Sequence, residues 1–350
     1  MGDMFACGEP EMDVLSVANP EEQVLKKIRN DPTNVPLSEA LQIVRTIAHK
    51  TGSETVLIDE SEGRILSEPI HASSDLPGFT CPIEPGKHIS RNNDDFKKNE
   101  LIFPEGWMIR TQDIPILASL GKIRIKVRKK PVIGIISTGK ELVPAESIPK
   151  PGEVREVNSH LIATFCRRQG AIPMKYGIVR DDLQELENLL MEASEECDAI
   201  IVSGGSNRDQ NDITAQVVRS LGKVYTEGIS FAPDKRTTIG KIGSVLVIGL
   251  PGHPSATFMV LTLVVVHLLQ AMKGAPCQRF YKKEARLTDH LCSIPQYDRY
   301  IRVRLTGDMA SPIFGKSGLI HMLYQSDGMV RVPAGHQGYR EGEWIEVMTW

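Results

Sequence analysis

Three glycine-containing loops carry the residues whose types and spacing could do chemistry. They read STGKEL at 137–142, SGGSNRDQND at 203–212 and GLPGHPSA at 249–256, and each leaves an apolar run that is typical of a buried strand. Glycine after a strand lets the backbone approach a ligand closely, and free N–H groups at the start of the next helix attract phosphate. One such turn alone is more often structural than functional. Three of them at the strand ends of a single sheet favour a ligand site.

The glycine spacing in these loops does not match the common nucleotide-binding motifs. Neither GxGxxG nor GxxxxGK[ST] occurs in the chain, so neither a dinucleotide nor a P-loop nucleotide is indicated. The second loop ends at Asp212, directly before the helical run ITAQVVRSLG. Asp is also an ideal helix N-cap. The sequence therefore leaves two interpretations of Asp212 open, a structural cap and a ligand contact.

The loops belong to a segment, residues 131–275, in which apolar strands alternate with helical patterns. Strands are expected at 132–137, 171–179, 198–203, 223–229 and 243–252, and helices at 158–170, 182–196, 213–222 and 254–272. This alternation predicts a parallel, doubly wound α/β domain. Ligands of such open sheets bind at the carboxyl ends of the strands, which is where the three loops fall.

Shorter elements flank this domain, and they predict an N-terminal α+β segment at 1–130 and a C-terminal all-β domain at 276–350. In the first, helices are expected at 20–29, 37–52 and 110–121, strands at 55–59 and 64–71, and turns with one short strand at 73–106. Ser38 and Thr111 are candidate helix caps, and Gly52 and Gly121 are candidate stops. In the second, short strands alternate with glycine turns, at 300–305, 328–333 and 344–350.

The composition is that of a soluble globular protein, with 41% hydrophobic and 24% charged residues and a formal net charge of −3. That charge gives no footprint for nucleic acid, and the basic stretch 122–130 alternates with Ile and Val as in a strand with one solvated face. The apolar run 258–272 falls short of the roughly 20 residues of a membrane span, so we expect a buried helix and no membrane contact. Six scattered cysteines without a CxxC pair, and no evident signal peptide, indicate the cytoplasm.

Six motifs in order then carry a resemblance to a known family. They are PVIGIISTGKELV, GEVREVNS, GAIPMKYGIVRDD, AIIVSGGSNRDQND, FAPDKRTTIG and GLPGHPSA. Together they resemble the molybdopterin-binding domain of the MoeA / gephyrin E-domain family, the molybdopterin molybdenumtransferases. PLSEALQIV and GRILSEPIHASSDLPGF are similar to that family's N-terminal segment, and the C-terminal domain to its last one, so the resemblance covers nearly the whole chain.

The resemblance implies a function, ligands and partners. Members of the family bind molybdopterin, usually adenylylated, and molybdate, hydrolyse the adenylate with a divalent cation such as Mg²⁺, and insert molybdenum into the dithiolene. They form elongated homodimers and act beside other proteins of molybdenum cofactor biosynthesis. The physical logic is a cradle of backbone amides and a lysine for phosphate, with carboxylates that hold the cation.

The resemblance also assigns site residues by their match to the motifs. Asp212 and Lys235 are the candidate catalytic residues, and Asp212 and Glu141 the candidate metal ligands. The candidate cofactor-binding residues follow the three loops and the Asn-Ser turn: Thr138, Gly139, Lys140, Asn158, Ser159, Ser203, Gly204, Gly205, Pro251, Gly252 and His253. His253 stands where Asn is usual, and hydrogen bonding is expected of it rather than metal ligation.

The chain departs from the family at several of these positions. Lys140 replaces an acid of the first loop, which would repel Mg²⁺ and still attract phosphate. Ala232 replaces a lysine, and the stretch SNRD after the two glycines of the second loop lacks the usual pattern. The family's β domain, with the aspartate that precedes it, is expected to be missing after residue 79.

Two other functions compete with the enzyme at this stage. The chain could be a non-catalytic paralogue that holds molybdopterin for storage, delivery or sensing, or it could be a scaffold protein. The retained glycine turn and Asp212 favour ligand binding, which both the enzyme and the non-catalytic paralogue require. The loss of two family acids counts against ordinary cation-assisted hydrolysis.

Overall fold

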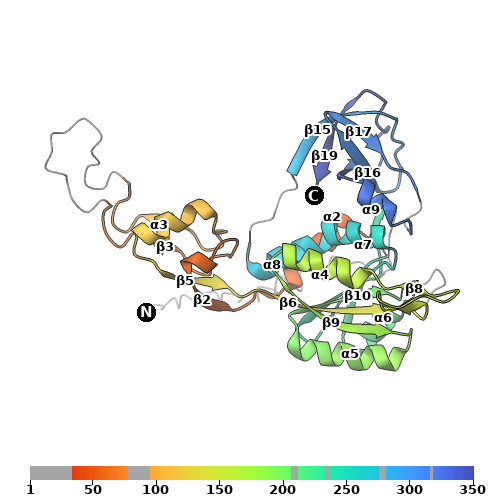
Figure 1. The fold of residues 1–350 in the computed structure, drawn as a ribbon, viewed down its shortest axis with the longest axis horizontal. Helices are drawn as coiled ribbons and strands as arrows, with labels where there is room; N and C mark the ends of the chain where they lie inside the picture. Colours follow the sequence, from red (N-terminus) through yellow and green to blue (C-terminus); the bar gives the residue numbers. More distant parts are fainter. Residues whose placement is uncertain (1–33, 77–94, 206–211, 233–235, 276–280, 316–317) are drawn as a thin grey trace, which may run out of the picture.

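The computed structural model describes residues 34–76, 95–205, 212–232, 236–275, 281–315 and 318–350. Figure 1 shows three parts: an α/β body, an arm of N-terminal residues that extends away from it, and a C-terminal β barrel. The predicted helix at 20–29 lies outside the described residues. So does the chain just after residue 79, where the missing β domain is expected.

A six-stranded sheet forms the centre of the body. Its order is β11 (Lys223–Thr226), β13 (Thr238–Ile242), β14 (Val245–Leu250), β10 (Ala199–Gly204), β6 (Val132–Thr138) and β9 (Ile172–Val179). The last four strands in this order pair in parallel, whereas β13 is antiparallel to both β14 and β11. The predicted doubly wound α/β domain is therefore confirmed, with an antiparallel edge that the sequence pattern did not reveal.

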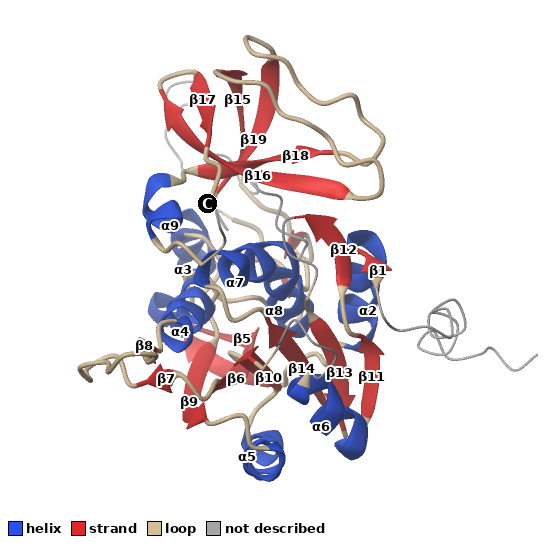
Figure 2. Ribbon diagram, turned by 90° about the vertical axis from the view of Figure 1, so that its right-hand side faces the viewer, coloured by secondary structure: helices blue, strands red, loops and turns tan. Residues whose placement is uncertain are grey.

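Helices cover both faces of this sheet (Figure 2). On one face lie α2 (Leu37–Ile47) and α4 (Asn158–Arg168), and on the other α5 (Leu183–Glu196) and α6 (Ile213–Leu221). Ile133 and Ile135 of β6 join the first core cluster, and Ile136 joins the second. This alternation follows from the two-residue period of a strand, and burial on both faces explains why these strands read as continuous apolar runs.

The longest apolar stretch is a core helix of the body. It comprises α7 (Pro254–Val260), a π-helical turn (Leu261–Val265) and α8 (Val266–Lys273). Pro254–Lys273 is long and apolar enough to cross a membrane by length and composition alone, but 89% of its most apolar window is buried inside the protein. The predicted buried helix at 254–272 is thus confirmed.

The arm contains two small antiparallel pairs and one short helix. The pairs are β2 (Ser53–Leu57) with β5 (Arg124–Arg128), and β3 (Ile70–His71) with β4 (Leu101–Phe103), and the helix is α3 (Ile114–Ser119). In β5 exposed and buried residues alternate, which confirms a strand with one solvated face. The predicted strand at 64–71 was too long, because only Ile70–His71 forms a strand and residues 65 and 66 make isolated bridges.

Three expectations for helix ends in this region were wrong: the Ser38 cap, the Gly52 stop and the Thr111 cap. α2 begins after Pro36 without any side-chain cap, so Ser38 does not cap it, and it ends at Ile47 because Ala48 is already extended. Thr111 opens a 3-10 turn and caps no helix. Gly121 has φ +69 and follows α3 as expected of a stop residue.

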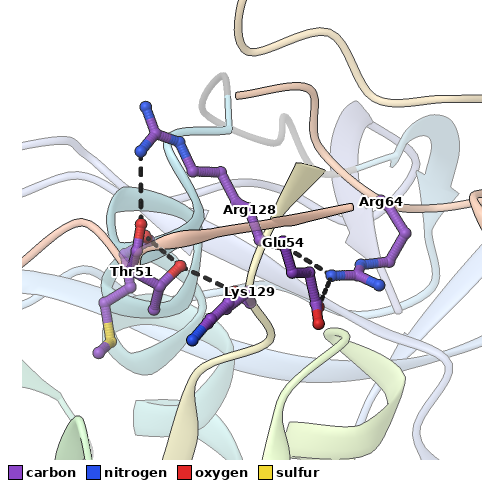
Figure 3. Close-up of polar contacts among 6 residues, drawn as sticks. Thr51, Glu54, Arg64, Arg128 and Lys129 are labelled. Atoms are coloured by element: carbon purple, nitrogen blue, oxygen red, sulfur yellow. Dashed lines mark hydrogen bonds and ion pairs between the residues drawn. The ribbon is translucent and has the colours of Figure 1, made fainter. Parts of the chain in front are cut away.

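Two chain segments join the arm to the body, and a cluster of hydrogen bonds holds them together (Figure 3). Thr51 Oγ1 donates to the carbonyl oxygens of Lys129, at 2.8 Å, and Met272, at 3.3 Å. Arg64 donates to the Arg128 carbonyl at 2.7 Å and pairs with Glu54. The end of α8 is therefore linked to both of the segments that join the arm to the body.

The C-terminal strands close into a barrel in the order β16 (Asp298–Thr306), β17 (Met309–Pro312), β15 (Tyr281–Leu287), β19 (Trp344–Thr349) and β18 (Gly328–Val332), which pairs back to β16. Two strands of the preceding chain, β12 (Ile229–Ala232) and β1 (Val35–Pro36), extend this sheet from β16. A five-residue helix, α9 (His321–Gln325), interrupts what was expected to be an all-β region. The barrel is thus joined to the body by backbone pairing.

Candidate functional site

The three glycine-containing loops leave adjacent strands at one edge of the body sheet. Gly204 of β10 lies opposite Thr138 of β6, and Ser203 of β10 lies opposite Leu250 of β14. We call this edge the crest, and define it as residues 137–141, 203–205, 212 and 250–253. The pairing register alone brings these loops side by side.

The two glycines of the crest are required by close packing and by backbone conformation. Gly204 has φ +99, and a Cβ atom there would lie 2.1 Å from the Thr138 carbonyl oxygen. Gly205 has φ +72, and a Cβ there would lie 2.9 Å from the Ile213 side chain. No larger residue fits at either position without a shift of the backbone or of a core residue. The structure therefore gives the glycines a packing role whether or not a ligand binds.

Asn158, the first residue of α4, ties two of the strand ends together. Its side-chain nitrogen donates to Ser203 Oγ and to the Gly252 carbonyl oxygen, at 2.8 Å each. Beside it, the backbone nitrogen and Oγ of Ser159 donate to the two carboxylate oxygens of Glu156, at 2.7 and 2.5 Å. Glu156 is 6% exposed and was not singled out from the sequence, although it precedes the Asn-Ser turn by two residues.

Asp212 caps α6, so the structural interpretation of this residue is confirmed. Its Oδ1 accepts from the Ala215 backbone nitrogen at 3.0 Å, and its Oδ2 accepts from Thr238 Oγ1 at 3.1 Å. Burial raises the pKa of Asp212 above its ordinary value, and these hydrogen bonds oppose that shift. Because the cap position lies on the crest, the same carboxylate remains a candidate for ligand contact.

The first loop is fixed by an aspartate that the sequence analysis missed. Thr138 Oγ1 donates to Asp181 Oδ1 at 2.9 Å, and the Lys140 backbone nitrogen donates to Asp181 Oδ2 at 3.3 Å. Asp181 follows β9 and has φ +52, a conformation that few residues other than glycine adopt. The signal in the sequence was the paired acid in VRDD, directly after a strand of the same sheet.

Lys140 and Glu141 are both exposed, and the carboxylate of Glu141 lies close to Gly139. A Cβ atom on Gly139 would be 3.1 Å from each carboxylate oxygen of Glu141. Among the described residues, no three His, Cys, Asp or Glu side chains are grouped so as to hold a metal ion. The predicted metal pair Asp212 and Glu141 therefore has no third ligand in this part of the chain.

The barrel contributes a buried cation next to the third loop, which the sequence analysis also missed. Arg302 of β16 is 6% exposed, and its guanidinium donates to the Ser255 carbonyl oxygen at 3.3 Å. Its Nε is buried with no hydrogen-bond partner among the described residues, and burial lowers its pKa. The barrel residue Gly318 also approaches this loop, since a Cβ there would lie 3.4 Å from His253 Cδ2. The barrel thus contacts the third loop, whose residues Gly252 and His253 remain exposed.

Further buried polar atoms at the crest have no partner within the described residues. They are Ser137 Oγ, Asn158 Oδ1 and Thr214 Oγ1. Thr214 Oγ1 lies near the glycine turn, 3.3 Å from where a Cβ of Gly205 would be. Native proteins leave few buried polar groups unsatisfied, so such a group of orphans indicates a bound water or ligand.

A cavity of about 500 Å³ adjoins the first loop. It is lined by Leu142, Pro144, Ala145, Glu146, Glu156, Ser159, His160, Lys175, Gly177, Ile178 and Arg180. Its size is within the range of small-molecule sites, about 300–1,000 Å³. It connects the Asn-Ser turn with β9, so it extends the crest toward the outer edge of the sheet.

Pro251 is buried directly after β14, and its carbonyl oxygen accepts a hydrogen bond from Thr257 Oγ1 at 2.6 Å. Lys235 and residues 206–211, which contain the departing stretch of the second loop, lie outside the described residues. All other predicted site residues lie at the crest or at the Asn-Ser turn beside it.

A doubly wound α/β body joined by its backbone to a C-terminal barrel, with ligand-type loops at one sheet edge, defines a multidomain cofactor-binding protein. Two family models match the chain: "Probable molybdopterin binding domain" at residues 134–271 and "MoeA C-terminal region (domain IV)" at residues 284–350. The chain belongs to the MoeA family, as the sequence motifs predicted.

Known proteins agree with this assignment over most of the chain. A Methanocaldococcus jannaschii protein named for molybdopterin biosynthesis is 27% identical over 91% of this chain and 79% of its own length. The molybdopterin molybdenumtransferase of Bacillus subtilis is 26% identical over 76% of this chain, which spans only 63% of that relative. The crystal structure of a molybdopterin biosynthesis MoeA protein from Pyrococcus horikoshii has a TM-score of 0.79 and 26% identity, and covers 91% of this chain and 99% of that one.

Proposed function

We propose that this protein acts in molybdenum cofactor biosynthesis as a molybdopterin molybdenumtransferase. It binds molybdopterin or its adenylate at the crest and inserts molybdenum from molybdate into the dithiolene. The observation that carries the proposal is the meeting of three strand ends at the crest, two of which Asn158 ties together. The α/β domain that bears the crest and the barrel beside it both match MoeA-family models.

Each part of the crest has a role in this proposal. The glycine turn at 204–205 and the start of α6 offer a close backbone surface to the phosphate-bearing part of the ligand. The unsatisfied atoms Ser137 Oγ and Asn158 Oδ1 supply hydrogen bonds to the polar edge of the pterin. Arg302, on the barrel side, attracts the molybdate dianion, for which a guanidinium is a suitable partner.

The described residues do not fit a resident Mg²⁺ ion well. Both oxygens of Asp181 and both oxygens of Asp212 accept hydrogen bonds within the protein, which limits the directions from which they can bind a cation, and among the described residues no third carboxylate or imidazole is grouped with Asp212 and Glu141. A magnesium ion requires near-octahedral oxygen ligands. The roles above are therefore assigned to side chains and backbone groups alone.

The proposal is tested by adding purified protein to adenylylated molybdopterin and molybdate, with AMP release and cofactor formation as two separate readouts. We expect both products. Tight binding of the adenylate without either product would refute the transferase and leave a carrier. If the protein does not bind adenylylated molybdopterin at all, the proposal that this molecule is its ligand is refuted.

We also propose that the protein is a homodimer in the cytoplasm and acts with other proteins of cofactor biosynthesis. The family assignment supports the dimer, and the described cysteines Cys166, Cys197 and Cys292, all free thiols, are compatible with a reducing compartment. Light scattering of the purified protein tests the dimer directly, and a mass of one chain at micromolar concentration would refute it.

A further inference from the structure

The acidic groups of the crest are engaged in holding the protein's own loops. Asp181 binds the first loop through Thr138 Oγ1 and the Lys140 backbone, and Asp212 binds Ala215 and Thr238. A divalent cation at these carboxylates would have only the lone pairs that the four hydrogen bonds leave free. Glu141 remains, but a single carboxylate is a small share of the ligands that a magnesium ion needs.

The first loop also carries a positive charge of the protein, at Lys140. Lys140 is the second residue beyond Thr138, which pairs with Gly204 in the sheet, so its loop adjoins the glycine turn. Its backbone is fixed by Asp181, while its side chain is exposed. From this loop the ammonium group can extend toward the glycine turn, where a phosphate can approach the backbone closely. It also raises the electrostatic cost of a divalent cation held by the neighbouring Glu141.

We propose that Lys140 binds the phosphate of the pterin ligand directly, and that the crest therefore binds this ligand without a divalent cation. This inference rests on the proposed function and deepens it. Lys140 takes the electrostatic role that a metal ion plays between carboxylates and phosphate, and Asp181 fixes the backbone from which the lysine extends. Phosphate binding in this protein is then a property of the chain alone.

The test is a titration of the full-length protein with molybdopterin under anaerobic conditions, once with EDTA and once with excess Mg²⁺. For the native protein we expect dissociation constants that agree within about two-fold in the two buffers, since the metal makes no contact. Lys140→Ala is expected to weaken binding about ten-fold in both buffers, as for the loss of one charge-assisted hydrogen bond. Lys140→Arg keeps the charge and should retain most of the affinity.

Two further variants keep the test decisive. Lys140→Asp is expected to bind more weakly than Lys140→Ala in EDTA and to recover part of its affinity with Mg²⁺, because a carboxylate replaces the ammonium group. Lys98→Ala removes an exposed lysine of the arm, outside the body that carries the crest, and should bind as the native protein does. Thermal melting of each variant checks the fold, which an exposed side chain should not affect.

The outcomes separate this inference from the proposed function. Native protein that binds molybdopterin only with Mg²⁺, or a Lys140→Ala variant with native affinity, overturns the inference and leaves the proposed function intact. If neither buffer supports binding, both fall together. Asp209 and Asp234 lie outside the described residues. If Mg²⁺ strengthens binding to the native protein but not to Asp209→Asn or Asp234→Asn, the substituted residue is a metal ligand and the inference is overturned.

Discussion

Asn158 donates a hydrogen bond to Ser203 Oγ at 2.8 Å, and the same nitrogen reaches the Gly252 carbonyl oxygen at the same distance. One side chain at the start of α4 thus holds the ends of β10 and the loop after β14 in a fixed relationship. The two residues are 45 positions apart in the chain, and nothing local requires them to meet.

Asn158→Ala should lower the free energy of unfolding and weaken molybdopterin binding together. It leaves the buried Ser203 hydroxyl and Gly252 carbonyl without their donor, a loss of about 1–3 kcal/mol. Urea unfolding and a binding titration measure the two effects. Asn188→Ala, an exposed residue of α5, is the matched control and should change neither by more than about 0.5 kcal/mol. Native affinity in the Asn158 variant would remove the residue from the site.

The two roles of Asp212 can be separated by a pair of substitutions. Asp212→Ala removes the cap of α6 and should cost about 0.5–2 kcal/mol, as should Asp182→Ala at the equivalent cap of α5. Asp212→Asn keeps an acceptor for Ala215 and should cost much less. If Asp212 also contacts the ligand, Asp212→Asn loses activity and Asp182→Ala does not. Full activity of Asp212→Asn would leave only the cap.

The same aspartate predicts a pH dependence with a definite sign. Burial raises the pKa of Asp212 from its ordinary value of 3.8, so the folded protein keeps this proton to a higher pH than the unfolded chain does. Its contribution to stability is complete below pH 3.8 and is lost as the pH rises through the folded pKa. The stability of the native protein relative to Asp212→Asn should therefore fall between pH 4 and neutrality, by urea unfolding at several pH values. A rise over that range would contradict the prediction.

Arg302 should matter for function and little for stability. Burial lowers its pKa, and no carboxylate pairs with it among the described ion pairs, so the charge is held at a cost. Arg302→Met should be neutral or stabilising by about 1 kcal/mol, as for other buried charges replaced by apolar residues. It should weaken molybdate-dependent cofactor formation strongly. Arg304→Met, two residues along the same strand and exposed, is the control. Equal activity in both variants would exclude an anion-binding role.

The arm has its own buried charge, which gives a fifth prediction. Asp113 is fully buried and accepts hydrogen bonds from Trp107 Nε1 at 2.8 Å and from Arg110. Burial alone would raise the pKa of Asp113, but these hydrogen bonds outweigh it and the pKa lies below its ordinary value. The stability that it confers is present at neutral pH and is lost as the pH falls through that pKa.

Asp113→Asn should therefore destabilise the arm by about 2 kcal/mol at neutral pH, with a smaller effect in acid. Trp107 fluorescence reports on the arm directly, because its ring donates to this carboxylate. Glu105→Gln breaks an ion pair to Arg128 in which Glu105 is half exposed and should cost less than about 1 kcal/mol. A constant difference between Asp113→Asn and native protein across the acid range would contradict the assignment.

The sequence predicted the strands and helices of the body well, because their apolar periodicity is a direct result of burial on two faces. It was less accurate in the arm. There α2 ends at Ile47, where the chain turns toward the arm, although five more residues have helical composition up to Gly52. The contacts of Thr51 with Lys129 and Met272 explain the early end, and both partners are distant in sequence. β13 was missed because an antiparallel strand, here between β11 and β14, gives no βαβ signal.

The residues of the candidate site likewise fall into those that the sequence identified and those that only the structure revealed. The sequence by itself determined the family, the three loops and the residues Asp212, Asn158 and Lys140, because motif, spacing and residue type are local properties. Only the tertiary structure decided that Asp212 is a cap with both oxygens engaged, that Asp181 fixes the first loop, and that Arg302 reaches the third loop from the barrel. Those facts depend on strand register and on the pairing of β12 with β16, which bring together residues that no sequence window contains.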